Sequence, residues 1–397
     1  MFLANTDARS GCRTDVKLKC EGALEMWDAR TGEIVPKCGI NRKGSTRIEL
    51  DFPAAGSFLL VLNPSEDGRT VSRQYQAQAS LREIPLERTW AIAEQSLNAL
   101  TLDFCRCRVN DREWSTPLPV WKAREIIQAA YGNSDFALEF SFRADLDAAG
   151  KQVHFVVETP EKFQFEINGR RLSFRDEGYW VDVSFRKMMV GEYLVRGENR
   201  IILSGKFEKD MELESCYLVG EFAVEQRKNE FVLSERPQVL REGNWVEQGY
   251  PFFCGSITAT QNISLPTLPE GPPKPEEHRR AGRAYLEFQK VNAIVVEIRV
   301  NGKVVDPLLW QPWEREVTEL LQVGENRIEV KVVNSLRNLL GPHHHRKGEL
   351  LRVNPGSFSD ESNWVDSYSF VPFGFVGARL VWKQDENFRH LGKQIRT

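Results

Sequence analysis

Apolar and polar residues alternate along much of the chain, which is the period of a β-strand with one buried face. The clearest case is Thr46–Phe52, where isoleucine, leucine and phenylalanine alternate with charged residues. Residues 29–32 (ARTG) lie between two similar segments and have the composition of a hairpin turn, with glycine where a positive φ is needed. We therefore expect residues 1–78 to form several antiparallel strands, either as a small sandwich or as the tail of a larger one.

Helical patterns are scarce. Residues 89–100 and 120–131 are each compatible with a short helix, and residues 317–322 with a single turn. A catalytic (β/α) barrel would instead alternate strands with helices of about 10–15 residues, and this alternation is missing from the sequence. The pattern predicts an all-β chain.

The pentapeptide GENRI occurs twice, at residues 197–201 and 324–328, and in both copies an Asn-Gly dipeptide precedes it, at residues 168–169 and 301–302. Asn-Gly is a strong hairpin signal, because a type I′ turn needs positive φ at both central positions. The residues after each GENRI alternate like a half-buried strand. We interpret the repeat as scaffold rather than chemistry.

This repeat predicts the domain organisation of the chain. A sandwich at residues 1–78 precedes two tandem jelly-roll β-sandwiches at residues 79–230 and 231–397. Residues 266–280 hold five prolines. Because strand-like sequence stands on both sides of them, an exposed loop within one sandwich is favoured over a linker between domains.

Charge and hydropathy argue against two classes of partner. Lys plus Arg is 53 and Asp plus Glu is 56, a net charge of -3. This balance lacks the basic footprint of a nucleic-acid binder and the polybasic patch of a membrane binder. No stretch approaches the ~20 apolar residues of a membrane span. We predict neither nucleic acid nor membrane as a partner.

The seven cysteines are odd in number, dispersed and free of any CxxC motif, so buried free thiols are favoured over a disulfide framework or a zinc site. The first 25 residues carry interspersed charges and do not read as a signal peptide. Both features favour a cytoplasmic location. A chain derived from a secreted precursor would instead be extracytoplasmic.

Candidate chemistry is sparse. Glycoside hydrolysis needs a pair of carboxyl groups, but most of the acidic residues fit solvated strand faces, so no catalytic residue is predicted. His343, His344 and His345 follow Gly341-Pro342. They lack an evident third partner for a metal, so packing or hydrogen bonding is favoured and no metal or cofactor is predicted. A structural calcium held by a loop is left open.

The tryptophans divide into two groups. Trp310 has a counterpart in Trp180 of the other repeat, which favours core packing over sugar contact. For Trp313 and Trp364, core packing and sugar contact are equally favoured, because exposed tryptophan rings suit stacking on sugars.

A family resemblance rests on several motifs and on the order in which they occur. They are residues 2–6 (FLANT), 25–33 (EMWDARTGE), 249–255 (GYPFFCG), 300–302 (VNG), 310–313 (WQPW), 324–328 (GENRI), 338–344 (NLLGPHH) and 371–374 (VPFG). The second copy resembles the galactose-binding-like, sugar-binding jelly roll of large bacterial glycoside hydrolases. The whole order resembles the region that follows the catalytic barrel in α-L-rhamnosidase-type and related family-two-like hydrolases.

The resemblance implies a non-catalytic accessory portion of a glycoside hydrolase. Its implied partners are carbohydrate and the catalytic barrel of the same or a neighbouring polypeptide. The family's catalytic carboxylates lie in that barrel, so none is transferred to this chain. The candidate carbohydrate contacts are Trp313, Trp364, His343, His344 and Asn338. The alternatives are a stand-alone carbohydrate-binding module and a purely structural domain.

Overall fold

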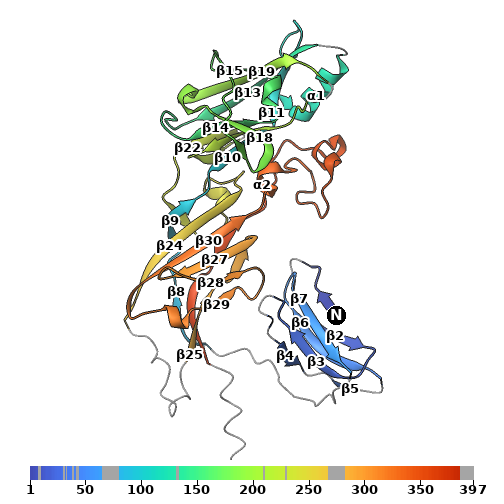
Figure 1. Ribbon diagram of the computed structural model, residues 1–397, viewed down its shortest axis with the longest axis vertical. Helices are drawn as coiled ribbons and strands as arrows, with labels where there is room; N and C mark the ends of the chain where they lie inside the picture. Colours follow the sequence, from blue (N-terminus) through green and yellow to red (C-terminus); the bar gives the residue numbers. More distant parts are fainter. Residues whose placement is uncertain are drawn as a thin grey trace, which may run out of the picture.

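The computed structural model describes residues 1–7, 10–29, 32, 34–37, 40–41, 44–64, 80–130, 134–208, 211–228, 230–266 and 282–384. Strands dominate these residues and form sheets stacked as sandwiches, in which all pairs are antiparallel except β13 with β22 (Figure 1). The all-β prediction is confirmed. Among the described residues, no helix combines the length and hydrophobicity needed to cross a bilayer.

The N-terminal sandwich pairs a four-stranded sheet, β1-β7-β3-β4, with a three-stranded sheet, β2-β6-β5. In β6 every second residue is buried, as its alternation predicts. Its inward side chains join Leu24 and Leu60 in a small core. The strands are β1 (Phe2–Ala4), β2 (Cys12–Leu18), β3 (Ala23–Trp27), β4 (Ile34–Lys37), β5 (Ile40–Asn41), β6 (Thr46–Phe52) and β7 (Ser57–Asn63).

The first jelly roll stacks the sheet β10-β20-β14-β18-β17 on a larger sheet that contains β12-β11-β13-β19-β15-β16, with β22 and β21 added to β13. One helix follows β12 and buries Val120, Ala123 and Ile127 on one face. The elements are β10 (Asn98–Leu102), β11 (Phe104–Val109), β12 (Leu118–Pro119), α1 (Val120–Ala129), β13 (Asp135–Ala144), β14 (Val153–Val157), β15 (Gln164–Ile167), β16 (Arg170–Leu172), β17 (Tyr179–Trp180), β18 (Asp182–Met189), β19 (Gly197–Lys206), β20 (Cys216–Gly220), β21 (Ala223–Arg227) and β22 (Glu230–Ser234).

The second jelly roll stacks the sheet β23-β9-β24-β30-β27-β28 on the sheet β29-β25-β32-β8, with a separate β26-β31 pair. The elements are β8 (Ser80–Pro85), β9 (Thr89–Gln95), β23 (Val239–Arg241), β24 (Gly255–Leu265), β25 (Gly282–Glu287), β26 (Lys290–Asn292), β27 (Val295–Val300), β28 (Lys303–Leu308), β29 (Glu314–Glu316), β30 (Gly324–Asn334), α2 (Arg337–Leu340), β31 (Gly374–Val376) and β32 (Arg379–Gln384). Single 3₁₀ turns lie at Pro160–Lys162, Gly191–Tyr193, Trp245–Gln248, Thr318–Leu320, Pro355–Phe358 and Glu361–Asn363.

The helix expected at residues 89–100 is wrong, because this segment forms β9 and β10. β9 pairs with β23 and β24, and β10 pairs with β20, so inter-strand hydrogen bonds override the local helical pattern. The two strands also lie in different jelly rolls. The predicted boundary at residue 79 places β8 and β9 in the first jelly roll, whereas both pair with strands of the second. The helix at residues 120–131 and the single turn at 317–322 are confirmed by α1 and Thr318–Leu320.

The proline-rich segment and the cysteines are also the subject of sequence predictions. Residues 267–280 of the proline-rich segment lie outside the described residues, and β24 and β25 on either side belong to the second jelly roll. Among the described cysteines, Cys105, Cys107, Cys216 and Cys254 are buried free thiols, as predicted. Cys12 is exposed, because it is the first residue of β2, whose N-terminal half is exposed on both faces.

In each repeat, two asparagine side chains are hydrogen-bonded to each other. Asn168 Nδ2 donates to Asn199 Oδ1 at 2.9 Å, and Asn301 Nδ2 donates to Asn326 Oδ1 at 2.9 Å. Asn168 and Asn301 have φ values of 50° and 52°, and the glycine after each is also at positive φ, so the type I′ turn prediction is confirmed. The repeated residues therefore hold the same turn against the same strand in both jelly rolls.

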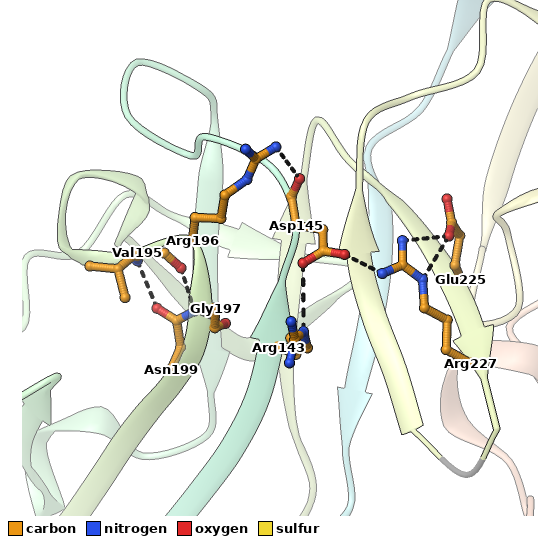
Figure 2. Close-up of polar contacts among 8 residues, drawn as sticks. All are labelled: Arg143, Asp145, Val195, Arg196, Gly197, Asn199, Glu225 and Arg227. Carbon is orange, nitrogen blue, oxygen red and sulfur yellow. Dashed lines mark hydrogen bonds and ion pairs between the residues drawn. The ribbon is translucent and has the colours of Figure 1, made fainter.

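The asparagine of each GENRI copy also ties down the loop before it. Asn199 accepts from Val195 N at 2.8 Å and donates to the carbonyls of Val195 and Gly197 at 2.7 and 3.1 Å (Figure 2). Asn326 bonds in the same way to the N–H and carbonyl of Gln322, at 2.8 and 2.7 Å. This matching set of bonds gives the repeat its structural role.

Candidate functional site

Residues 336–370, here called the clasp, extend from the second jelly roll onto the first. The clasp begins with α2, after β30, and Figure 1 shows it in orange beside the first jelly roll. Leu339 belongs to the buried core of the first jelly roll, and Leu340, Tyr368 and Phe370 pack against that core. Thr101 Oγ1 donates to Leu339 O at 2.9 Å. A loop of one jelly roll thus completes the core of the other.

Asn338 closes the base of the clasp. It is 1% exposed, its Nδ2 donates to Val371 O at 2.8 Å, and its Oδ1 accepts from Val371 N at 2.8 Å. Both ends of the amide are engaged by backbone, which fixes the two ends of the clasp side by side.

The histidines of the clasp are buried against the first jelly roll. His343 Nε2 lies 2.9 Å from Asn338 O, and burial lowers the pKa of His343 to about 4. His344 Nε2 lies 3.1 Å from Asp103 Oδ2, and its Nδ1 lies 3.0 Å from Val365 O. Asp103 comes from the turn between β10 and β11, so this contact joins the two jelly rolls.

Asp103 also binds the last aromatic ring of the clasp. The Tyr368 hydroxyl donates to Asp103 Oδ1 at 2.5 Å. Burial first, and then the charge of Asp103, raises the pKa of Tyr368 well above its ordinary value, so the phenol stays protonated as a donor. Asp103 therefore accepts from Tyr368 through one oxygen and faces His344 through the other.

Trp364 covers this cluster. Its ring stacks on His344, with centroids 4.5 Å apart and planes at 23°, and it packs edge-on against Trp121 of α1 at 5.6 Å. Its Nε1 donates to Asp366 Oδ1 at 3.0 Å. The structure thus brings four of the five predicted carbohydrate contacts, Trp364, His343, His344 and Asn338, into one cluster, in which their polar groups bond to protein.

Trp313 lies apart from the clasp. It is half-buried against the core of the second jelly roll, and its carbonyl accepts from Phe288 N at 2.8 Å. No group of three His, Cys, Asp or Glu side chains within the described ranges has an arrangement that would hold a metal ion.

Trp310 is 51% exposed, which contradicts its predicted core packing. Its counterpart Trp180 lies in β17 and packs against Tyr217, with centroids 6.1 Å apart. Trp310 lies instead in the loop between β28 and β29, so no neighbouring strand fixes its ring inward. Leu309, the residue before it, and Val304 of β28 are also exposed. Sequence reasoning missed this exposed ring, because position in a repeat does not determine burial.

The loop that carries Trp310 leads into β29, which belongs to a sheet with several charged side chains. Lys383 forms ion pairs with Glu314 and Glu287, the latter at 3.3 Å, and lies 5.1 Å from the Tyr285 ring centroid. Burial alone would raise the pKa of Glu287, but the hydrogen bond from Arg379 and the two cationic charges outweigh it and lower the pKa. The ionised groups of this sheet are therefore paired with one another, and β29 directly follows the loop that carries Trp310.

Carboxyl groups gather at a small hollow of the first jelly roll. Glu158, Glu212 and Glu214 line it together with apolar residues and Cys216. Burial raises the pKa of Glu158 and of Glu214, and charge repulsion among the three adds to the effect. Arg124 donates to Glu214 Oε1 at 2.9 Å, and Ser184 donates to Glu158 Oε1 at 3.3 Å. These bonds give the carboxyl groups protein partners within the sandwich.

No protein-family model and no curated protein matches the chain. Among solved structures, the chain is similar to the rhamnosidase of Novosphingobium sp. PP1Y, with 11% identity, a TM-score of 0.38, and coverage of 96% of this chain and 22% of that one. It is similar to the α-L-rhamnosidase of Streptomyces avermitilis, complexed with L-rhamnose, with 13% identity, a TM-score of 0.22, and coverage of 83% and 34%. It is also similar to the β-D-mannosidase of Dictyoglomus thermophilum, with 11% identity, a TM-score of 0.22, and coverage of 60% and 31%. The chain spans only a minor part of each of these proteins.

Proposed function

We propose that the chain is the non-catalytic, carbohydrate-binding accessory portion of a glycoside hydrolase resembling α-L-rhamnosidases. The ordered motifs support this assignment, as do two jelly rolls built on the same asparagine pair. The observation that carries the binding role is the exposed ring of Trp310, in the loop that leads directly into β29 and its ion-paired Glu314. An aromatic face with polar groups at its edge is the usual chemistry of sugar recognition.

The partner that we propose is a catalytic barrel on the same or a neighbouring polypeptide. The tip of the clasp supports this part of the proposal, because Leu351 is 99% exposed and Val353 and Phe358 are also exposed. Exposed apolar side chains within one loop suit burial against another domain.

A second candidate function is a purely structural one. It is favoured by His344, which contacts Asp103 of the first jelly roll, and by His343 and Asn338, whose polar groups bond within the second jelly roll and its clasp. Under this alternative the chain braces a barrel and leaves sugar recognition to it.

Glycan binding distinguishes the two candidates. We expect the chain to bind rhamnose-containing oligosaccharides on a glycan array, and Trp310→Ala to weaken binding about tenfold or more in titration calorimetry, equivalent to ~1.4 kcal/mol. Phe358→Ala is the matched control, since it removes another exposed ring far along the chain. It should leave glycan binding unchanged.

Two outcomes would count against this proposal. Absence of binding across the array would favour the structural alternative. Turnover of aryl glycosides by the chain would overturn the non-catalytic assignment, and loss of that turnover in Glu214→Gln would locate the chemistry at the carboxyl-lined hollow.

A further inference from the structure

His344 lies between two groups that accept hydrogen bonds. Its Nδ1 is 3.0 Å from the carbonyl oxygen of Val365, and its Nε2 is 3.1 Å from Asp103 Oδ2. A backbone carbonyl and an ionised carboxylate cannot donate, and a neutral imidazole has a single N–H. A neutral His344 beside an ionised Asp103 offers one N–H for two acceptors. Both short contacts are hydrogen bonds only if the pair carries one additional proton.

The surroundings place this extra proton on the imidazole. Asp103 already accepts from the Tyr368 hydroxyl at 2.5 Å, and a donor of this kind favours the ionised carboxylate. Imidazole is intrinsically the more basic of the two groups. The Trp364 ring stacked on His344 at 4.5 Å also attracts a cation. His344 is thus an imidazolium, paired with a carboxylate that is itself largely buried.

We infer that the clasp is a proton-dependent latch, in which a doubly protonated His344 bonds Asp103 of the first jelly roll and Val365 of the clasp at once. Loss of the proton leaves one of the two acceptors buried without a donor. A buried acceptor that loses its partner destabilises the contact that contains it. Raising the pH therefore loosens the clasp from the first jelly roll.

Other charged and titratable groups lie near His344. His343 Nδ1 is 3.8 Å from Asp103 Oδ2, His345 Nε2 is 3.8 Å from Asp360 Oδ2, and Asp366 accepts from Trp364 Nε1. His343 on the clasp is neutral at pH 7, because burial lowers its pKa to about 4. Arg337 of α2 is bonded to Glu349 at 2.7 Å, and Lys122 of α1 forms an ion pair with Glu361 at 2.8 Å. Tyr368 stays protonated, as its raised pKa requires.

Nitrogen NMR of the histidine-labelled full chain tests the protonation state directly. We expect both ring nitrogens of His344 to carry protons at pH 7, with the signal assigned by its loss in His344→Gln. A single protonated nitrogen at pH 7 would overturn the inference.

Hydrogen exchange tests the latch. The N–H groups of Val365 and Ser369 donate to the carbonyls of His344 and His343, so they report on clasp closure. After correction for intrinsic exchange, we expect their protection to fall by up to about tenfold per pH unit once the proton is lost, because one proton is linked to closure. Protection that is flat from pH 7 to 9 would contradict the latch.

Two variants separate proton linkage from general destabilisation. In Asp103→Asn the new amide donates to a neutral imidazole and still accepts from Tyr368, so the clasp should stay closed and lose its pH dependence. His154→Gln is the control, because His154 is equally buried, contacts Glu177 at 3.0 Å, and its Nδ1 has no partner among the described residues. It should keep the wild-type dependence. An unchanged slope in Asp103→Asn would overturn the inference even if that variant is less stable.

Discussion

At the scale of single residues, two asparagines explain why five residues recur in this chain. Asn199 and Asn326 are fully buried, and each is bonded to the Asn-Gly turn and to its own preceding loop. Buried amides that satisfy several backbone groups at once are costly to remove, because every partner is then left without a bond.

Asn326→Ala should therefore lower the free energy of unfolding of the second jelly roll by about 2–4 kcal/mol, measured by chemical denaturation. The matched control is Arg327→Ala, because Arg327 is the next residue along and its side chain is exposed. A loss no greater than that of the control would show that the asparagine bonds contribute little to stability.

At the scale of elements, the clasp is a segment whose structure depends on its contacts with the first jelly roll. Its helix α2 is a single short turn that would not be stable alone. It is held because Leu339 is buried in the first jelly roll and Thr101 bonds the Leu339 carbonyl. The clasp is therefore ordered by docking rather than by its own helical propensity.

Leu339→Ala should weaken clasp docking by about 2–5 kcal/mol, the usual cost of truncating a buried leucine. Limited proteolysis should then cleave the clasp faster than in the wild type. Leu351→Ala is the matched control within the same segment, since Leu351 is 99% exposed. Equal cleavage rates for the two variants would show that Leu339 does not anchor the clasp.

At the scale of the whole molecule, the two jelly rolls are joined through buried polar groups rather than through apolar residues alone. Asp103, His343, His344 and Tyr368 share this contact with the surrounding aromatic rings. A buried histidine makes such a contact sensitive to pH.

Acid should weaken this contact through His343. The folded-state pKa of about 4 lies below the ordinary value of 6.5, so the unfolded chain binds the proton first. Stability is then present above pH 6.5 and is lost as the pH falls towards 4, by up to about 3 kcal/mol. Unfolding measured from pH 7 to 4 should show this loss, and His343→Gln should remove most of it. An identical acid profile in His343→Gln would assign the loss to other groups.

Much of the architecture could be predicted from local sequence. The strict alternation of β6 and the two Asn-Gly turns are local signals, because strand period and positive φ depend on neighbouring residues only. The strand at residues 89–95 could not be distinguished from a helix in this way. Its state was decided by β23 and β24, far along the chain.

The candidate site also separates what local sequence determines from what distant contacts determine. The sequence by itself determined the all-β class, the repeat and its turns, since these follow from short-range geometry. The tertiary structure alone decided that Trp310 is exposed and that His344 meets Asp103, a residue 241 positions away. Burial and protonation depend on which distant groups come into contact, and only the packing of the two jelly rolls brings those groups together.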